Sequence, residues 1–286
     1  MTIEPLTIDA GDGLFLAATL FRPDTQAKTA LMIAPATGIK RTFYQAIATW
    51  LAEVGYGVIT FDNHGIGESL SGRLKGCPAS LESWGRQDMS AVFRALKQQF
   101  PDCAYHLIGH SAGGQLLGLM EGAQALNSAF LVASSSGCLK NMDQPFKAKA
   151  HFFMNGFIPL SNAIFGYTQS SWVGMGEPLP KAVAAQWATW CNGRGYVETA
   201  FDKTVFEHSY HTLNLPIQWI YLSDDEIACE ANVFDMQRVF SAAEHTTTRL
   251  EPKDYGVSHI GHMRFFSRKS RDTLWPLLTE WLEKHI

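Results

Sequence analysis

The pentapeptide Gly109-His110-Ser111-Ala112-Gly113 follows the apolar run Leu107 to Ile108 and precedes a glycine-rich stretch, Gly113 to Ala125, that we expect to be helical. A serine hydroxyl becomes a nucleophile when a tight turn exposes it, a base takes its proton and donors face the developing oxyanion. The two glycines would permit such a turn and let the helix approach the strand closely. An ordinary loop between a strand and a helix would also fit this pattern, so further residues have to distinguish the two.

The composition is that of a globular protein with a sizeable core. The chain has 286 residues, of which 46% are hydrophobic, enough for one large α/β domain or two small ones. A net charge of -4 and the absence of any Lys/Arg block argue against nucleic acid or an anionic membrane as the main partner and favour a small molecule. The five scattered cysteines show no metal-ligand spacing, so we expect reduced thiols and no metal site.

The sequence also bears on location. No basic stretch followed by an apolar run opens the chain, and no segment approaches the roughly 20 apolar residues of a membrane span. We therefore expect a cytoplasmic protein without a membrane span.

Seven apolar or β-branched runs are predicted to be strands: Leu14 to Phe21, Thr29 to Ala34, Tyr56 to Phe61, Ala104 to Gly109, Ala129 to Ala133, Ile217 to Leu222 and Thr246 to Leu250. Helical periodicity predicts helices that end at Gly55 and before Pro101, and a C-terminal helix with Asp272 as N-cap. This alternation predicts an α/β fold, with a mostly parallel sheet covered by helices on both faces. Ligands of such sheets bind beyond the carboxyl ends of the strands.

The alternation stops between Leu139 and His211, where no clear strand appears and aromatic residues accumulate: Phe152, Phe153, Phe157, Phe165, Tyr167, Trp172, Trp187 and Trp190. The segment is too long for a loop within a compact domain. We predict a largely helical cap over residues 139–211, inserted into a core formed by residues 1–138 and 212–286. The aromatic side chains either line an apolar pocket or form the cap's own core.

An acid and a histidine follow Ser111 in the chain order that a serine nucleophile on a parallel sheet requires. Asp224 and Asp225 follow the predicted strand ending at Leu222. Asp225 is preferred because the apolar Ile227 two positions later is typical of the turn that directs such an acid toward the site. The same residues would also form a good solvent-exposed acidic turn.

His262 is the expected general base. It follows Gly261 and precedes an apolar run, so its ring can be held at a turn, and we prefer it to His259 on that ground. Histidines that precede Ser111 or the last predicted strand, that lie in the cap, or that lie at the far end of the C-terminal helix do not fit this place. They are interpreted as core, surface or cap residues: His64, His106, His110, His151, His208, His211, His245 and His285.

Two backbone N–H groups are expected to stabilise the oxyanion. One is that of Ala112, directly after the nucleophile, and the other belongs to the loop Pro35-Ala36-Thr37-Gly38 that follows the predicted strand ending at Ala34. Thr37 occupies the expected position of the donor, but the sequence leaves Ala36 open as an alternative.

These residues resemble the α/β-hydrolase superfamily. The stretch Asp62 to Ser69 adds to the resemblance, since it is similar to the superfamily's D-x-R-G-x-G-x-S motif, with His64 in place of the arginine. The residues Gly174 to Pro180 and Gly261-His262-Met263 are similar to those of predicted bacterial serine hydrolases of the lipase or esterase type. The resemblance implies an α/β-hydrolase fold with an eight-stranded sheet, a lid and a catalytic triad.

Together these patterns predict hydrolysis of a carboxylic ester, or of a thioester or amide, through an acyl-enzyme on Ser111, with His262 as base and Asp225 orienting it. The expected substrate is a small, partly apolar acyl compound, and no cofactor is expected. The same triad could serve an acyltransferase. A ligand-binding protein that keeps the fold without turnover is the alternative from another class.

Overall fold

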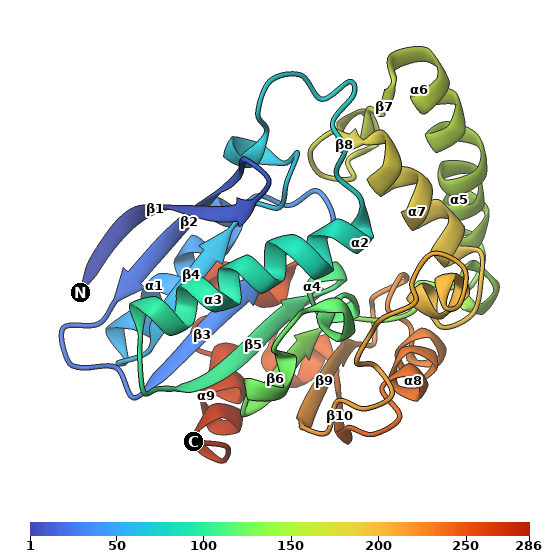
Figure 1. Ribbon diagram of the computed structural model, residues 1–286. Coiled ribbons are helices and arrows are strands. Elements are labelled where there is room, and N and C mark those ends of the chain that lie inside the picture. The colour runs from blue at the N-terminus through green and yellow to red at the C-terminus, as the bar shows by residue number, and fades with distance from the viewer.

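An eight-stranded sheet forms the centre of the computed structural model, which describes residues 1–286 (Figure 1). Its strand order is β1-β2-β4-β3-β5-β6-β9-β10. β1 pairs antiparallel with β2, and β2 antiparallel with β4, while all other pairs are parallel. The predicted α/β fold with a mostly parallel sheet is confirmed. The strands are β1 (Thr2–Gly11), β2 (Leu14–Arg22), β3 (Thr29–Ala34), β4 (Gly57–Phe61), β5 (Ala104–His110), β6 (Ser128–Val132), β9 (Pro216–Leu222) and β10 (Glu244–Leu250).

The edge strand β1 has no counterpart among the seven strands predicted from the sequence. Most of its residues are exposed, so it lacks the apolar run that marks the inner strands. It is held by a tight connection to β2 in which Asp12 and Gly13 both have positive φ angles. Such an Asp-Gly pair is a hairpin signal, and it is the feature from which β1 could have been predicted.

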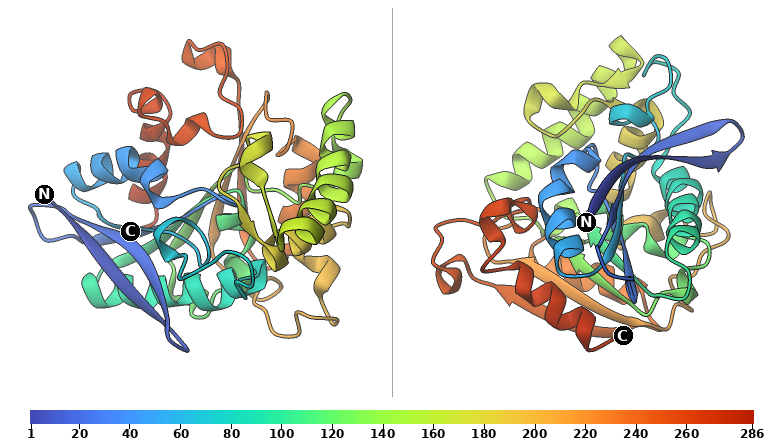
Figure 2. Two further views of the ribbon diagram at one scale, coloured as in Figure 1. Left: turned by 90° about the horizontal axis from the view of Figure 1, so that it is seen from above. Right: turned by 90° about the vertical axis from the view of Figure 1, so that its left-hand side faces the viewer.

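Helices cover both faces of the sheet (Figure 2). α3 lies on one face, and α1 and α9 lie on the other. No helix has the length and hydropathy that crossing a bilayer requires. The helices are α1 (Gln45–Glu53), α2 (Leu81–Ser83), α3 (Ser90–Gln99), α4 (Ala112–Gln115), α5 (Phe146–Phe152), α6 (Ile158–Phe165), α7 (Lys181–Cys191), α8 (Glu230–Val239) and α9 (Trp275–Glu283).

Two details of the helices differ from the prediction. α9 is capped by Leu274 and not by Asp272, because Pro276 lacks an N–H and fixes the first turn of the helix around itself. The glycine-rich stretch from Gly113 to Ala125 is not one helix. It forms the single turn α4 followed by two short 3₁₀ turns, because closely packed glycines bring this segment against the sheet.

Gly113 is the tightest of these contacts, and it gives a testable prediction. A Cβ at this position would lie 2.1 Å from the carbonyl oxygen of Ala34 in β3. Gly113→Ala should therefore push α4 away from the sheet and lower the free energy of unfolding by about 1–3 kcal/mol. Urea unfolding would measure this. Gly156→Ala is the matched control, since a Cβ there would meet only the exposed ring of Phe152, at 3.3 Å. Equal stability of the two variants would contradict the prediction.

The segment between β6 and β9 carries α5, α6 and α7, which lie together beside the carboxyl ends of the central strands (Figure 1). The segment is largely helical, as expected. It also contains one small antiparallel ladder that the sequence did not predict, between β7 (Tyr167–Thr168) and β8 (Leu179–Pro180). The two strands are too short to leave a periodic pattern.

Several of the aromatic residues of this segment pack on one another. Phe153 contacts Phe157 and Trp187, with ring centroids 5.7 and 5.6 Å apart, and Trp190 packs edge-on against Tyr196 at 5.0 Å. Phe153 and Trp190 are buried. These side chains form an apolar core inside the helical segment, which was one of the two interpretations left open by the sequence.

Candidate active site

Ser111 lies in a sharp turn between β5 and α4, at the carboxyl edge of the sheet. Its backbone angles are φ 49° and ψ -112°, a conformation that residues other than glycine rarely adopt. The turn can form because a Cβ at position 109 would lie 2.7 Å from the backbone of Gly114, so only glycine fits there. β5, Ser111 and α4 thus form a tight turn of the kind that Gly109 and Gly113 were expected to permit.

Asp225 and His262 come together at the same edge of the sheet. The Nδ1–H of His262 donates to Oδ2 of Asp225 over 2.7 Å. The other carboxylate oxygen, Oδ1, accepts the backbone N–H groups of Ile227 at 2.9 Å and Ala228 at 3.0 Å. These bonds fix the carboxylate on the turn after β9. They also leave Nε2 of His262 without a proton, so that this atom can accept one.

Asp224, the alternative acid, has a different set of partners. Its two oxygens accept the N–H groups of Ile260 at 2.8 Å and Gly261 at 2.9 Å. His259, the alternative base, is paired with Asp224 and not with Asp225. Asp224 therefore holds the loop that carries His262, whereas Asp225 contacts the imidazole itself.

The pKa values of the two partners shift in opposite directions. Burial disfavours the charged form of His262, but the adjacent Asp225 carboxylate outweighs burial and raises the pKa of the imidazole. Burial likewise acts against the Asp225 carboxylate, but the His262 charge and the hydrogen bonds of the imidazole and the turn lower its pKa. Asp225 is thus a fixed negative charge at neutral pH, and His262 is a stronger base than an isolated histidine.

The two candidate oxyanion donors in the loop after β3 differ in whether their N–H is free. The N–H of Ala36 donates to the phenolic oxygen of Tyr44 over 2.9 Å, whereas the N–H groups of Thr37 and Ala112 donate to no group of the protein. Of the two candidates left open by the sequence, Ala36 is therefore already used.

His110 and Tyr44 are a feature of the site that the sequence analysis did not identify. Tyr44 Oη lies 2.8 Å from Nδ1 of His110, and Nε2 of His110 lies 2.9 Å from the carbonyl oxygen of His262. His110 and Tyr44 are fully buried. His110 directly precedes Ser111, which is the signal that could have pointed to it. No sequence pattern connects Tyr44 with the site, because the contact forms only in the folded chain.

The stretch from Asp62 to Ser69 is paired with an arginine from another part of the chain. His64 stands at the arginine position, and Arg41 supplies the guanidinium instead, paired with both Asp62 and Glu68. The Arg41 backbone N–H also donates to Oδ1 of Asp62 over 2.6 Å. Because Arg41 lies between the loop after β3 and Tyr44 in the sequence, this pair anchors the segment that leads from that loop to Tyr44.

A hydrogen-bonded serine and histidine lie deep inside the sheet. Nδ1 of His106 on β5 is 2.8 Å from the hydroxyl of Ser128, the first residue of β6, and both residues are inaccessible to solvent. The indole of Trp281 donates to the same hydroxyl over 2.9 Å. The pair lies toward the amino end of the strands, away from the edge where substrates bind. The pair is part of the core, one of the places to which the sequence analysis assigned His106, although Nε2 of its ring has no hydrogen-bond partner.

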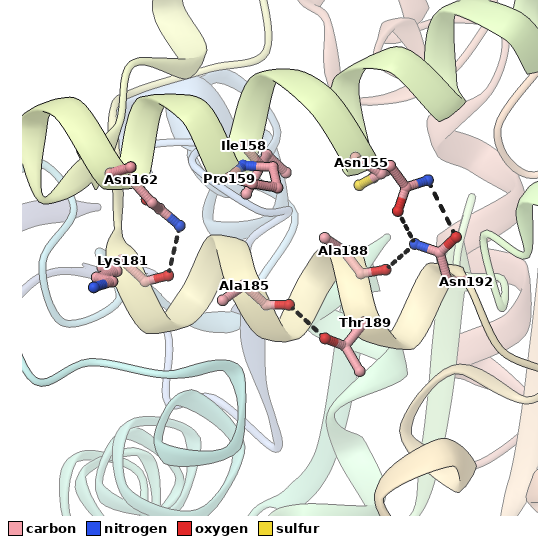
Figure 3. A pocket seen from close by; sticks show the side chains of 11 residues that line it. Asn155, Ile158, Pro159, Asn162, Lys181, Ala185, Ala188, Thr189 and Asn192 are labelled. Atoms are coloured by element: carbon pink, nitrogen blue, oxygen red, sulfur yellow. Dashed lines mark hydrogen bonds between the residues drawn. The ribbon is translucent and has the colours of Figure 1, made fainter.

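One hollow on the surface lies outside the predicted site. It has a volume of about 450 Å³ and lies between α6 and α7 (Figure 3). Asn155 and Asn192 are joined by reciprocal amide hydrogen bonds of 3.2 and 2.8 Å. A second hollow of about 310 Å³ is lined by Asp224 and Asp225 but not by Ser111 or His262. The amide pair of Asn155 and Asn192 in the first hollow joins α7 to the helical segment that leads into α6.

Asp88 is a buried acid that gives a stability prediction. It lies in a π-helical turn, one of its oxygens accepts the His64 N–H at 2.7 Å, and the other has no partner. Burial raises its pKa to about 8. The folded state therefore holds a proton that the unfolded state releases near pH 4, so stability falls as the pH rises from about 4 to 8.

Asp88→Asn removes this ionisation but keeps an acceptor for the His64 N–H. We expect the variant to melt about 2–4 °C above the parent at pH 8 and to show less difference at pH 5. Thermal unfolding at the two pH values measures the effect. If the melting temperature of the variant drops equally at both pH values, ionisation of the Asp88 carboxyl does not destabilise the folded protein.

The fold is that of the α/β-hydrolases, as the resemblance implied. Residues 25–183, more than half of the chain, match the family model Hydrolase_4, described as serine aminopeptidase, S33, and the chain belongs to this family. It is therefore an enzyme of the α/β-hydrolase type. No curated protein is a significant match to the chain in sequence.

Several solved structures share the fold over its whole length. A soluble variant of monoglyceride lipase from Saccharomyces cerevisiae is 15% identical with a TM-score of 0.71, and the match covers 100% of this chain and 95% of that one. A thermostable carboxyl esterase from Bacillus coagulans is 14% identical with a TM-score of 0.66, covering 100% and 99%. An esterase from Thermogutta terrifontis is 16% identical with a TM-score of 0.57, covering 99% and 100%. At these identities the likeness establishes the fold.

Proposed function

We propose that the protein hydrolyses a carboxylic ester through an acyl-enzyme on Ser111, with His262 as general base and Asp225 as the acid that orients it. The observation that carries the proposal is the hydrogen bond between His262 and Asp225, made on the loops next to the strained serine. The His262 backbone is itself bonded to His110, the residue directly before Ser111. The base and the nucleophile are therefore tied to adjacent positions.

Each group has a defined task in this mechanism. Nε2 of His262 takes the proton from the Ser111 hydroxyl as its oxygen attacks the acyl carbon, and then returns that proton to the leaving alcohol. Asp225 holds the proton on Nδ1 and stabilises the imidazolium. Water then attacks the acyl-enzyme by the same route and releases the acid.

The N–H groups of Ala112 and Thr37 form the proposed oxyanion hole. Both are without a partner in the protein, and Ala112 directly follows the nucleophile on the first turn of α4. Thr37 is preferred to Ala36 because the Ala36 N–H is bonded to Tyr44. Such donors stabilise the charge that develops in the transition state.

Residues 139–211 are proposed to be a cap that limits which acyl compound enters, inserted between core segments 1–138 and 212–286. Supporting this, the Glu177 N–H donates to the carbonyl oxygen of Gly38 over 2.8 Å, and its carboxylate lies 3.2 Å from the Lys40 ammonium. The cap thus touches the oxyanion loop. With its aromatic content, it favours a small, partly apolar acyl substrate.

Labelling and a substrate panel test the proposal together. A fluorophosphonate should modify the folded protein on Ser111, located by peptide mass spectrometry, and Ser111→Ala should not be labelled. A chain-length series of aryl esters, with thioesters and aminoacyl arylamides, should show turnover of esters above that of amides. Added alcohol acceptors would reveal acyl transfer as a second product. Absence of labelling in the folded protein would favour a ligand-binding role and overturn the proposal.

A further inference from the structure

A chain of three hydrogen bonds joins the loop after β3 to the loop that carries His262. It runs from the Ala36 N–H to Tyr44, from Tyr44 to His110, and from His110 to the His262 carbonyl, with distances of 2.9, 2.8 and 2.9 Å. The two ends belong to segments more than 200 residues apart in the sequence. Each end lies next to a group that the proposed mechanism uses. At one end, Ala36 directly precedes Thr37, the proposed oxyanion donor. At the other end, the accepting carbonyl belongs to His262, whose imidazole is the proposed base.

The chemistry of the two ends sets the direction of every bond. A carbonyl oxygen only accepts, so Nε2 of His110 must carry the proton that is donated to His262. Nδ1 of the neutral ring then accepts the Tyr44 O–H, and the Tyr44 oxygen accepts the Ala36 N–H. A protonated His110 would carry a second N–H aimed at Tyr44 and would break this sequence of donors.

The surroundings keep both side chains in these states. The ring of Phe266 packs against His110 with centroids 4.6 Å apart and against Tyr44 at 5.1 Å, and Phe43 stacks on His110. Burial, with a contribution from the neighbouring His262 charge, lowers the pKa of His110 to about 3, so the ring stays neutral. Burial also raises the pKa of Tyr44 and keeps its proton on the oxygen.

We propose that His110 and Tyr44 are positioning residues that hold the oxyanion loop and the loop of the general base at a fixed distance from each other. This rests on the proposed function, which it refines. The hydrogen-bond chain fixes the His262 backbone through His110, which directly precedes Ser111, while Asp225 fixes the His262 ring. It also turns the Ala36 N–H away from substrate, so that the free Thr37 N–H is the one presented to the oxyanion.

Tyr44→Phe is the first test, because it removes one oxygen and two hydrogen bonds but keeps the ring packing. We expect kcat for an aryl ester to fall about 10-fold or more while KM changes less than about threefold, since misplaced groups act on the transition state more than on binding. Tyr196→Phe is the matched control, because the hydroxyl of Tyr196 is buried and has no partner. It should leave kcat unchanged.

Two variants of His110 test its two hydrogen bonds separately, the one to Tyr44 and the one to the His262 carbonyl. In His110→Gln the side-chain amide nitrogen can replace Nε2 and donate to the His262 carbonyl. In His110→Asn the amide oxygen can replace Nδ1 and accept from Tyr44, but the side chain is too short to reach His262. The Gln variant should therefore keep more of the parental kcat than the Asn variant, by about fivefold or more. His106→Gln, on the same strand at its other end, controls for loss of a buried histidine.

The results distinguish failure of this inference from failure of the proposed function. If Ser111→Ala abolishes turnover but Tyr44→Phe keeps the parental kcat, the inference is wrong and the triad stands. If the Gln and Asn variants of His110 lose kcat equally while folded, the link to His262 does not position the base. If Ser111→Ala retains full activity, the proposed function fails first. Melting temperatures of all variants show which losses of kcat come from unfolding. If the His110 variants unfold, the nearly isosteric Tyr44→Phe variant alone tests the inference.

Discussion

Ser111→Ala is expected to lower kcat/KM for aryl esters on the order of 10⁴-fold or more, because the acyl-enzyme cannot form without the hydroxyl oxygen. The strained turn is preserved, since alanine differs from serine only by that oxygen. The stability of the folded protein should change by less than about 1 kcal/mol, because the Ser111 side chain makes no hydrogen bond within the protein. Steady-state kinetics with a chain-length series of esters, next to thermal unfolding, measure both.

Ser128→Ala is the control that makes this result specific. The hydroxyl of Ser128 is bonded to a histidine ring, but it lies in the core beside His106 and Trp281. The variant should lose stability, because buried polar partners are left unsatisfied, yet keep kcat/KM per folded molecule. Parental kinetics of Ser111→Ala, or a loss of the same size in folded Ser128→Ala, would refute Ser111 as the nucleophile.

Asp225→Asn is expected to have the second largest effect, a loss of kcat on the order of 10⁴-fold, the size found when the acid of a comparable triad becomes an amide. The amide nitrogen can point at Nδ1 of His262, where only an acceptor fits, and so favour the wrong tautomer. The variant also loses the negative charge that raises the pKa of His262.

The pH profile gives this prediction its sign. The base works only when neutral, so kcat/KM of the parent should fall as the pH drops through the pKa of His262, which Asp225 places above 6.5. In Asp225→Asn burial acts without the carboxylate, and the acid limb of the remaining activity should move below 6.5. A limb that does not move would mean that Asp225 does not act on the base.

Asp224→Asn serves as the matched control in the adjacent position. It removes the charge beside His259 and weakens the bonds to the Ile260 and Gly261 N–H groups, but leaves the bond between Asp225 and His262 in place. We expect at most about a 10-fold loss of kcat and an acid limb close to that of the parent. A larger loss than in Asp225→Asn would exchange the roles of the two acids.

Much of the fold and of the candidate site follows from local sequence. Alternating apolar runs and helical periods predicted seven of the eight strands and the parallel sheet, because fully buried strands leave continuous apolar runs. The edge strand β1 was missed because an exposed strand leaves no such run. Ser111, Asp225 and His262 could be selected by chain order, because parallel strands bring their carboxyl ends to one edge.

The tertiary structure decided what depends on contacts between distant segments. Only packing shows that Asp225 contacts the His262 ring while Asp224 holds its loop, since the two acids are adjacent in the sequence. Only packing shows that the Ala36 N–H donates to Tyr44. Only packing shows that Arg41 pairs with Asp62 in a motif where His64 stands in place of the arginine. Apolar periodicity records how much of each element is buried, which is a local property. The partner of a polar group depends on which donors and acceptors of distant segments the fold brings next to it, and a local sequence pattern does not contain that information.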